Sequence, residues 1–207
     1  MLAVGLAVQA DPPPAPGMLA LPRAASFALA FFVVFTALGS AYLWLHYTYR
    51  DSADRLAMTA TVRDPMLRGV YTTPERAQVV GDVLDELSRR VRPGDVLLAM
   101  ESTPMINFAT RTRPYLGNSW PNLYVGSELE QSLEWALKAR PGLPVVVAAR
   151  TDTRNRSWPR NASLNRGDVS VLNRERMRRF LDQFGYRVVW ENPMFQILEP
   201  SRRVPSG

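Results

Sequence analysis

The stretch Val96-Leu97-Leu98-Ala99-Met100 is a short, uninterrupted apolar run that follows the turn-forming residues Pro93-Gly94-Asp95. Such a run, bounded by turn residues, is typical of a strand that is buried on both faces of a parallel sheet. Residues 145–149 (VVVAA) repeat the pattern after a break rich in proline and glycine at 141–144. The sequence therefore predicts two buried strands, and we expect the first to lie at the centre of the sheet.

Helical patterns alternate with these strands. Thr72-Thr73-Pro74-Glu75 supplies an N-cap hydroxyl and a proline suited to a first helical turn, which predicts a helix to about Arg90. Ser127-Glu128-Leu129-Glu130 matches a capping box that opens a second helix, to about Arg140. A third helix is predicted over residues 173–184, where Gly185 follows, and residues 59–62 have the pattern of a short strand.

The C-terminal part has the pattern of a β-hairpin. Its predicted strands, residues 186–190 and 195–198, are joined by Glu191-Asn192-Pro193-Met194, and we expect the hairpin at the sheet edge. Strands that alternate with helices indicate an α/β fold. The expected fold is one N-terminal transmembrane helix followed by a small three-layer α/β domain with a mainly parallel sheet and a C-terminal β-hairpin.

The transmembrane prediction comes from residues 24–45, which are 22 uncharged and mostly apolar residues. A helix of that length spans about 33 Å, enough to cross a bilayer. Charged and aromatic residues flank it, as is typical of membrane–water interfaces. The residues expected at the interface are Arg23, Trp44, His46, Tyr47 and Arg50.

We divide the chain accordingly into five parts. They are a Pro-rich N-terminal segment (1–22), the transmembrane helix with its aromatic belt (23–49), a juxtamembrane connection (50–71), the α/β domain (72–200) and a tail (201–207).

Two features of the anchor leave alternatives open. Gly39 and Ala41 match the small-residue spacing of a signal-peptidase site, whereas the length of the apolar run favours a retained anchor. The short apolar stub before the prolines is either the tail of an earlier span in a longer ancestor or untranslated, with translation beginning at Met18.

Composition excludes several kinds of chemistry. The 207 residues include Cys 0 and His 1, so disulfides, thiolate–metal sites and a thiol nucleophile are excluded, and Ser-His-Asp triads and multi-His metal sites are not expected. We expect no metal and no cofactor. The net charge of +6 comes with no recognised nucleic-acid-binding motif, so we expect no nucleic-acid partner.

The positive charge is concentrated between residues 150 and 187, which hold ten Arg and four acidic residues. Such a surface suits anionic lipid headgroups or an acidic protein. The alternative is a solvated face in a chain that prefers Arg, since Lys138 is its one lysine. The predicted basic surface consists of Arg154, Arg156, Arg160, Arg174, Arg178 and Arg179.

Polar and aromatic residues are dense just after the first buried strand, over residues 101–121. Ligands of open α/β sheets bind beyond the carboxyl ends of the strands, which makes this segment a candidate contact site for a ligand or partner. The candidate residues are Glu101, Asn107, Arg111, Arg113, Tyr115, Asn118 and Trp120. In the alternative interpretation, Thr103-Pro104 caps a short helix, the apolar residues after it fill the core, and Glu101 pairs with an arginine.

Four stretches carry a resemblance to a known family. They are GVYTTPERA (69–77), GDVL (94–97), PMINFAT (104–110) and PYLGNSWP (114–121). They resemble the C-terminal extracytoplasmic domain of multi-spanning bacterial glycosyltransferases of the lipid-phosphosugar-dependent mannosyltransferase and aminoarabinose-transferase type. The resemblance implies a bacterial inner-membrane protein with its C-terminal domain in the periplasm.

The same resemblance argues against catalysis by this chain. The family places an essential acidic residue in the first extracytoplasmic loop of a many-helix membrane core, and we predict one span and no such loop here. We assign no catalytic residue. The sequence therefore favours a non-catalytic, single-pass accessory subunit that docks on a larger membrane complex, for example a respiratory or photosynthetic one, and contacts membrane lipids. The alternative is a remnant or partner module of a membrane glycosyltransferase that binds a sugar acceptor or a lipid-linked sugar.

Overall fold

The structure is a computed structural model that describes residues 23–48, 51–52, 54–101, 103–154, 156, 158–160 and 168–201. The chain forms two units, Met1–Leu43 and Trp44–Gly207. The predicted N-terminal segment 1–22 and residues 202–207 of the predicted tail lie outside the described residues.

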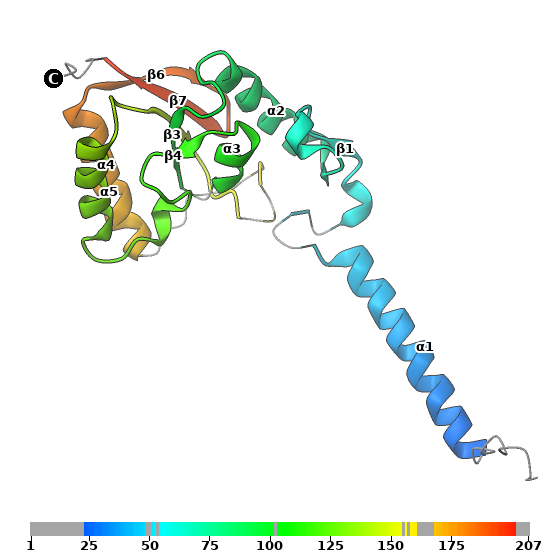
Figure 1. Ribbon diagram of the computed structural model, residues 1–207. Coiled ribbons are helices and arrows are strands. Elements are labelled where there is room, and N and C mark those ends of the chain that lie inside the picture. The colour runs from blue at the N-terminus through cyan, green and yellow to red at the C-terminus, as the bar shows by residue number, and fades with distance from the viewer. Residues whose placement is uncertain are drawn as a thin grey trace, which may run out of the picture. The chain divides into compact units, whose positions relative to one another are not determined.

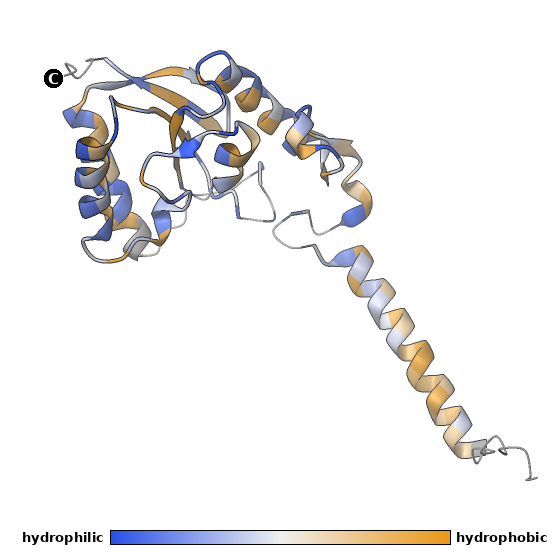
Figure 2. Cartoon of the chain, in the orientation of Figure 1, coloured by the Kyte–Doolittle hydropathy of each residue, from blue (hydrophilic) through white to orange (hydrophobic). Residues whose placement is uncertain are grey.

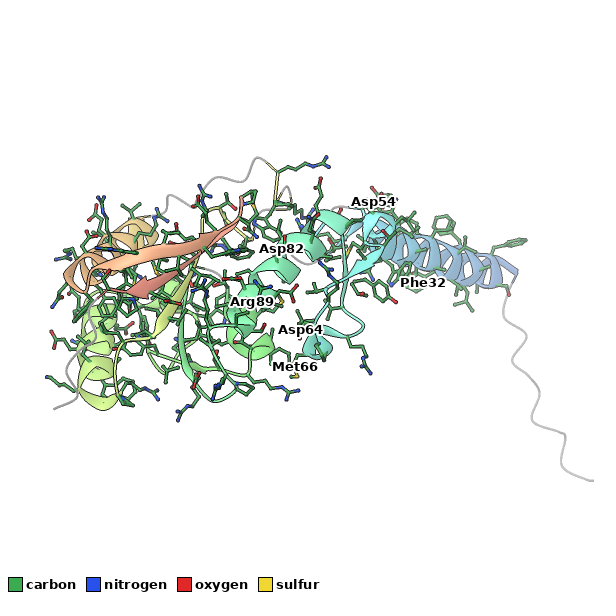
Figure 3. The ribbon with its side chains drawn as sticks, turned by 90° about the horizontal axis from the view of Figure 1, so that it is seen from above. Phe32, Asp54, Asp64, Met66, Asp82 and Arg89 are labelled. Carbon is green, nitrogen blue, oxygen red and sulfur yellow. The ribbon has the colours of Figure 1, made fainter. Side chains whose placement is uncertain are left out.

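Most of α1 (Arg23–His46) lies in the first unit. Its span from Ala24 to His46 is long and apolar enough to cross a membrane. Apolar residues are distributed all round the helix. Figure 2 shows the apolar colouring along the side in view. Phe27, Phe32 and Phe35 are all exposed, and Phe32 is labelled in Figure 3. A helix that is apolar all round is stable only when protein or lipid covers it.

The second unit is built on a five-stranded sheet with the strand order β4-β3-β5-β7-β6. Strand β3 is parallel to β4 and β5, whereas β7 is antiparallel to both β5 and β6. The bounds are β3 (Val96–Met100), β4 (Arg113–Pro114), β5 (Val145–Ala149), β6 (Tyr186–Glu191) and β7 (Phe195–Pro200). The predicted strands at 96–100 and 145–149 and the C-terminal hairpin are confirmed.

Two expectations about this sheet were wrong. The sheet is mixed rather than mainly parallel, because the second hairpin strand pairs with β5 and a tight turn forces it to run opposite to β6. Strand β5, not β3, lies in the middle, because both hairpin strands add on the far side of β5. Only β6 of the hairpin is an edge strand, because β7 is hydrogen-bonded to β5 on one side and to β6 on the other.

Helices cover both faces of the sheet and give three layers (Figure 1). One core contains Leu97, Val147 and Ile197, and it packs under α2 (Pro74–Ser88) and α3 (Pro104–Ala109). The other core contains Leu98, Val146 and Leu198, and it packs under α4 (Glu128–Ala139) and α5 (Asp168–Gln183). Adjacent strand residues therefore point into different cores, as the pleat requires.

The helix starts are set by local chemistry that the sequence predicted in part. Thr73 caps α2 as expected, and its hydroxyl accepts a hydrogen bond from the Arg76 backbone N–H. The predicted capping box at α4 was wrong. The Ser127 hydroxyl instead accepts a hydrogen bond from the Gln131 amide, and the Glu128 carboxylate accepts one from the backbone N–H of Val125.

The predicted juxtamembrane connection is folded against the domain in its described residues. It holds η1 (Arg55–Ala57), η2 (Pro65–Leu67) and a small antiparallel sheet of β1 (Ala60–Thr61) and β2 (Tyr71–Thr72). The carboxylates of Asp54 and Asp64 cap the two short helices, and both residues are labelled in Figure 3. Val62 and Leu67 are buried in the core beneath α2.

An arginine on α2 holds this segment to the rest of the domain. The Arg76 guanidinium, 6% exposed, forms an ion pair with Asp51 and donates hydrogen bonds to the backbone oxygens of Trp158 (2.6 Å) and Arg156 (2.7 Å). The Thr72 hydroxyl donates to the same Asp51 carboxylate. Three segments that are far apart in sequence therefore meet at one buried side chain.

Candidate functional site

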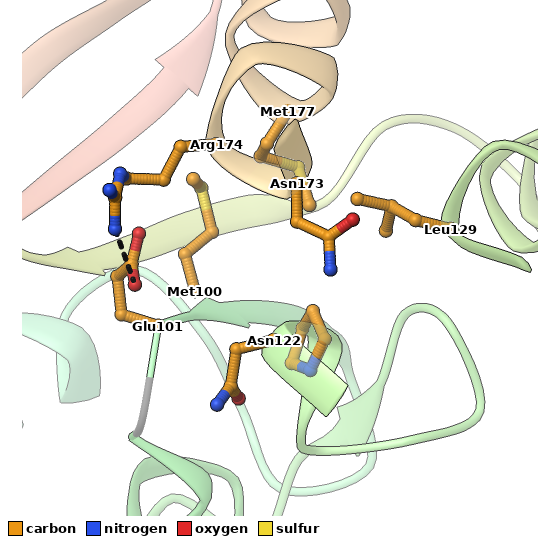
Figure 4. A pocket seen from close by; sticks show the side chains of 8 residues that line it. Met100, Glu101, Asn122, Leu129, Asn173, Arg174 and Met177 are labelled. Atoms are coloured by element: carbon orange, nitrogen blue, oxygen red, sulfur yellow. Dashed lines mark ion pairs between the residues drawn. The ribbon is translucent and has the colours of Figure 1, made fainter. Parts of the chain in front are cut away.

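Glu101 follows β3 directly, at the carboxyl end of the sheet where ligands of such folds bind. Its backbone has φ +62°, in the left-handed region that costs a non-glycine residue energy. The carboxylate is mostly buried and lies 4.0 Å from the Arg174 guanidinium on α5, as Figure 4 shows. The pairing of Glu101 with an arginine, which the sequence offered as an alternative, is the arrangement found.

The space beside Glu101 is small. The cavity has a volume of about 20 Å³, and it is lined by Met100, Glu101, Pro121, Asn122, Leu129, Asn173, Arg174 and Met177 (Figure 4). Roughly 10–15 Å³ is the minimum for one water molecule. The carboxylate thus faces room for about one water molecule, which is too little for a sugar or a phosphate ester.

The surroundings of Glu101 favour its protonated form. Burial raises the pKa of the carboxyl group and Asp152 raises it further, while the positive charges of Arg174 and Arg154 lower it by less. The net result is a pKa above the ordinary value for glutamate, although an ion-pair partner is close.

This pKa predicts a pH-dependent effect of Glu101→Gln. Because the folded state binds the proton more tightly than the unfolded state, the wild-type side chain loses stability as the pH rises from the unfolded pKa to the folded pKa, and the full cost remains above that. The variant should therefore have a higher melting temperature than the wild type near pH 8. The difference should disappear near pH 3, which is below the ordinary glutamate pKa of about 4.3, so that both states of the wild type are protonated. Thermal melts at several pH values test this, and a variant that melts lower at pH 8 would contradict it.

Two other candidate residues are structural. Asn107 is buried and donates hydrogen bonds to the Leu97 carbonyl (3.3 Å) and to the Thr112 hydroxyl (3.2 Å). Tyr115 is among the largest fully buried side chains, and its ring lies 6.4 Å from that of Phe180. Both residues hold the loop between β3 and β4 in place, so neither is presented to a ligand.

Arg111 and Arg113 lie at the other end of the sheet from Glu101. Arg113 pairs with Val96, the first residue of β3, and its guanidinium donates to the Gly94 carbonyl at 2.9 Å. The Arg111 guanidinium lies 3.1 Å from the sulfur of Met66. Because β4 runs parallel to β3, its first residue must lie beside the start of β3. The seven predicted residues therefore do not form one site.

The last two candidates lie in different depressions. The Asn118 side-chain oxygen accepts a hydrogen bond from the Trp120 backbone N–H (2.9 Å), yet Asn118 lines one groove and Trp120 lines another cleft. We call the first of these the Trp135 groove. Its volume is about 630 Å³, and it is lined by Leu116, Asn118, Leu123, Tyr124, Glu128, Gln131, Ser132 and Trp135.

Hydrogen bonds and a cation–ring contact shape the Trp135 groove. The Tyr124 hydroxyl donates to the Leu116 carbonyl at 3.1 Å, and the Asn173 amide donates to the Tyr124 carbonyl at 2.8 Å. Trp135 is 48% exposed, and the Arg140 guanidinium lies 5.2 Å from the centre of its ring. Trp135 was not among the residues predicted from the sequence, and the available signal was a tryptophan within an otherwise ordinary amphipathic helix.

The predicted basic surface is largely engaged in contacts. Five of its arginines are in ion pairs, and the Arg156 guanidinium lies 4.9 Å from the centre of the Tyr47 ring. The pairs are Arg154–Asp152, Arg160–Glu75, Arg174–Glu101, Arg178–Asp182 and Arg179–Glu130. The positive charge of this region is therefore interleaved with acidic side chains.

Three of the predicted interface residues can be placed. Trp44 and His46 lie in the last turn of α1 and Tyr47 follows it, while the Arg55 guanidinium lies 4.8 Å from the centre of the Trp44 ring. The side chain of Arg23 and all of Arg50 lie outside the described residues.

Among the described residues, no group of three or more His, Cys, Asp or Glu side chains is arranged to hold a metal ion. No family model, no curated protein and no solved structure matches this chain.

Proposed function

We propose that this chain is a non-catalytic, single-pass membrane protein whose α/β domain docks on a larger membrane complex. Support for the anchor comes from α1, which is apolar on all sides and long enough to cross a bilayer. The domain is joined to this helix by a segment that Asp51 and Arg76 tie to α2. A domain anchored in this way is suited to presenting one surface to a neighbouring membrane protein.

The observation that carries the docking proposal is the exposed apolar surface around the Trp135 groove. Leu123, Val125, Trp135 and Leu172 are each about half exposed or more. The hydrogen bond from Asn173 to Tyr124 brings the start of α5, which holds Leu172, beside the loop that holds Leu123. Exposed apolar patches of this kind mark interaction sites, and tryptophan is a frequent centre of binding energy.

Helix α4, which lines the groove, is held to α5 by charge. Glu130 on α4 accepts hydrogen bonds from Arg176 (3.2 Å) and Arg179 (3.3 Å) on α5. A surface held in this way loses little conformational freedom on binding, which favours affinity. We propose that the occupant is an apolar side-chain cluster of a partner membrane protein, which enters between Leu123 and Trp135.

Substitution of Leu123 by Glu should weaken recovery of the partner. The variant places a charge in the apolar part of the groove, and we expect roughly tenfold less partner at equal amounts of bait, equivalent to about 1.4 kcal/mol. The measurement is mild-detergent extraction of the native membrane, affinity isolation through a C-terminal tag and quantitative mass spectrometry.

The matched control is Phe108→Glu, at a side chain that is exposed to a similar degree on α3 but does not line the groove. This variant should retain the partner. Equal recovery with both variants, or recovery of the wild-type chain alone, would contradict docking through the groove.

A second candidate function is a glycosyltransferase module that binds a sugar acceptor or a lipid-linked sugar. The observation in its favour is that Asn118, Gln131 and Trp135 line the same groove. Amides and an aromatic face are what sugar hydroxyls and CH groups require. This function would be supported by copurification of a multi-spanning sugar transferase, together with binding of α-mannobiose that is lost in Trp135→Ala.

A further inference from the structure

One apolar side chain shortly after α1 is left almost entirely in solvent. Leu56, in the middle of η1, is 69% exposed, more than any other large apolar side chain among the described residues beyond α1. The carboxylate of Asp54 caps η1 and accepts a hydrogen bond from the Leu56 backbone N–H at 2.9 Å. The short helix therefore holds Leu56 away from the core of the domain, and removal of this side chain from water would be favourable.

The residue before Leu56 contacts the end of α1. The Arg55 guanidinium lies 4.8 Å from the centre of the Trp44 ring, and both residues belong to the second unit. A second contact of this kind joins the Arg156 guanidinium to the ring of Tyr47, at 4.9 Å from its centre. Consecutive Cα atoms are only about 3.8 Å apart. Leu56 therefore begins one residue away from a side chain that packs on Trp44.

The length of α1 sets the level of Trp44 in a bilayer. The apolar span Ala24–His46 has 23 residues. As a helix it is about 35 Å long, slightly more than a hydrocarbon core of roughly 30 Å. The last turn of α1 then lies where the hydrocarbon core ends, which is the level at which tryptophan is enriched. Arg55 and Leu56 lie near the same level, because Arg55 contacts Trp44.

We propose that η1 is a membrane-contacting surface, with Leu56 immersed in the interfacial layer of the phospholipid bilayer that holds α1. The inference rests on the proposed anchor and does not depend on the Trp135 groove. Leu56 leaves water in this layer, while the Arg55 guanidinium and the Asp54 carboxylate stay among the headgroups. These neighbouring charges are opposite in sign, so the surface that fits them is zwitterionic, as in phosphatidylcholine. The contact limits how far the domain swings on its anchor.

The test uses the absence of cysteine from the chain. Leu56→Cys in the full chain supplies a single thiol for a nitroxide spin label, and the labelled protein is placed in phosphatidylcholine nanodiscs. Electron paramagnetic resonance then compares how often the label collides with oxygen, which concentrates in the bilayer, and with a neutral nickel chelate, which stays in water. We expect the oxygen-to-nickel collision ratio at residue 56 to be several-fold higher than at a solvent-exposed control position.

Two further labelled variants give the reference levels. Leu123→Cys is the matched control, because Leu123 also lies in a 3₁₀-helix, η3 (Pro121–Leu123), and is 62% exposed. With no partner protein in the nanodisc, we expect this label to be in water. Val33→Cys, within α1, reports on the anchor and should give the highest ratio. Because Leu56 and Leu123 are both exposed, these two variants should melt at the wild-type temperature, which checks that they fold.

The outcomes separate this inference from the anchor on which it rests. Equal ratios at residues 56 and 123, with residue 33 in the bilayer, would overturn the membrane contact and leave the anchor standing. Leu56 would then be a candidate contact for a protein partner instead. A low ratio at residue 33 would contradict the anchor itself. A high ratio at residue 56 that appears only after phosphatidylglycerol is added would overturn the assignment to a zwitterionic surface.

Discussion

Substitution of Arg76 by Met should lower the free energy of unfolding by about 3–5 kcal/mol, the usual cost of removing one partner from a buried ion pair. Methionine fills a similar volume but leaves Asp51 without its cation. It also leaves the backbone oxygens of Trp158 and Arg156 without the guanidinium donors. Chemical denaturation of the full chain in detergent measures the loss.

Arg160→Met is the control for this experiment. Arg160 also pairs with a carboxylate near the start of α2, that of Glu75, but its side chain is 76% exposed. Solvent screens an exposed pair, so we expect no measurable change in stability. If Arg76→Met and Arg160→Met lower the free energy of unfolding equally, burial of the Arg76–Asp51 pair is not what holds the juxtamembrane segment to the domain.

Limited proteolysis would show which part of the domain loses stability in Arg76→Met. Arg76 lies on α2 and pairs with Asp51, at the start of the folded juxtamembrane residues. It also donates to the Trp158 carbonyl, in the loop after β5. In Arg76→Met, we expect cleavage to begin between residues 51 and 72 before the sheet is attacked. Cleavage that begins in α4 or α5 instead would contradict this role.

Alanine substitutions at Leu97 and Leu98 should each lower the free energy of unfolding by about 2–5 kcal/mol. These neighbours on β3 are almost fully buried, at 0% and 1% exposed, but they belong to different cores. A sheet covered on one face would show a large loss at only one of them. Equal losses in the free energy of unfolding at Leu97 and Leu98 would therefore show that helices cover both faces of the sheet.

The control for the strand pair is Leu137→Ala on α4, where the side chain is 37% exposed. We expect a loss below about 1 kcal/mol there, since little apolar surface returns to water. A negligible effect at Leu97 or at Leu98 would contradict the three-layer arrangement. Denaturant midpoints and slopes for the three variants can be compared directly.

Local patterns in the sequence were sufficient for most elements of secondary structure. The apolar runs at 96–100 and 145–149 predicted two strands, and the Thr73-Pro74 start predicted α2. These patterns succeed because propensity, capping and turn chemistry act over a few residues. The capping box at Ser127 failed because other side chains engage its two groups: the Ser127 hydroxyl accepts from the Gln131 amide, and the Glu130 carboxylate accepts from Arg176 and Arg179.

The candidate site was predicted much less well than the fold. The residues of 101–121 are close in sequence, but the crossover from β3 to the parallel β4 returns the chain to the start of the sheet. Arg113 is thereby separated from Glu101, while Asn107 and Tyr115 turn inward to hold the loop. Sequence proximity says little about spatial proximity where a loop crosses from one end of a sheet to the other.

The sequence by itself determined an apolar helix long enough for a bilayer, an α/β pattern, a C-terminal hairpin and the exclusion of cysteine chemistry. Only the tertiary structure decided the strand order, the antiparallel insertion of β7, the pairing of the arginines and the two depressions. Asp51, Arg76 and Trp158 share one cleft although they come from three distant segments. The physical reason is that packing and charge pairing depend on distances in space, which a linear pattern does not contain.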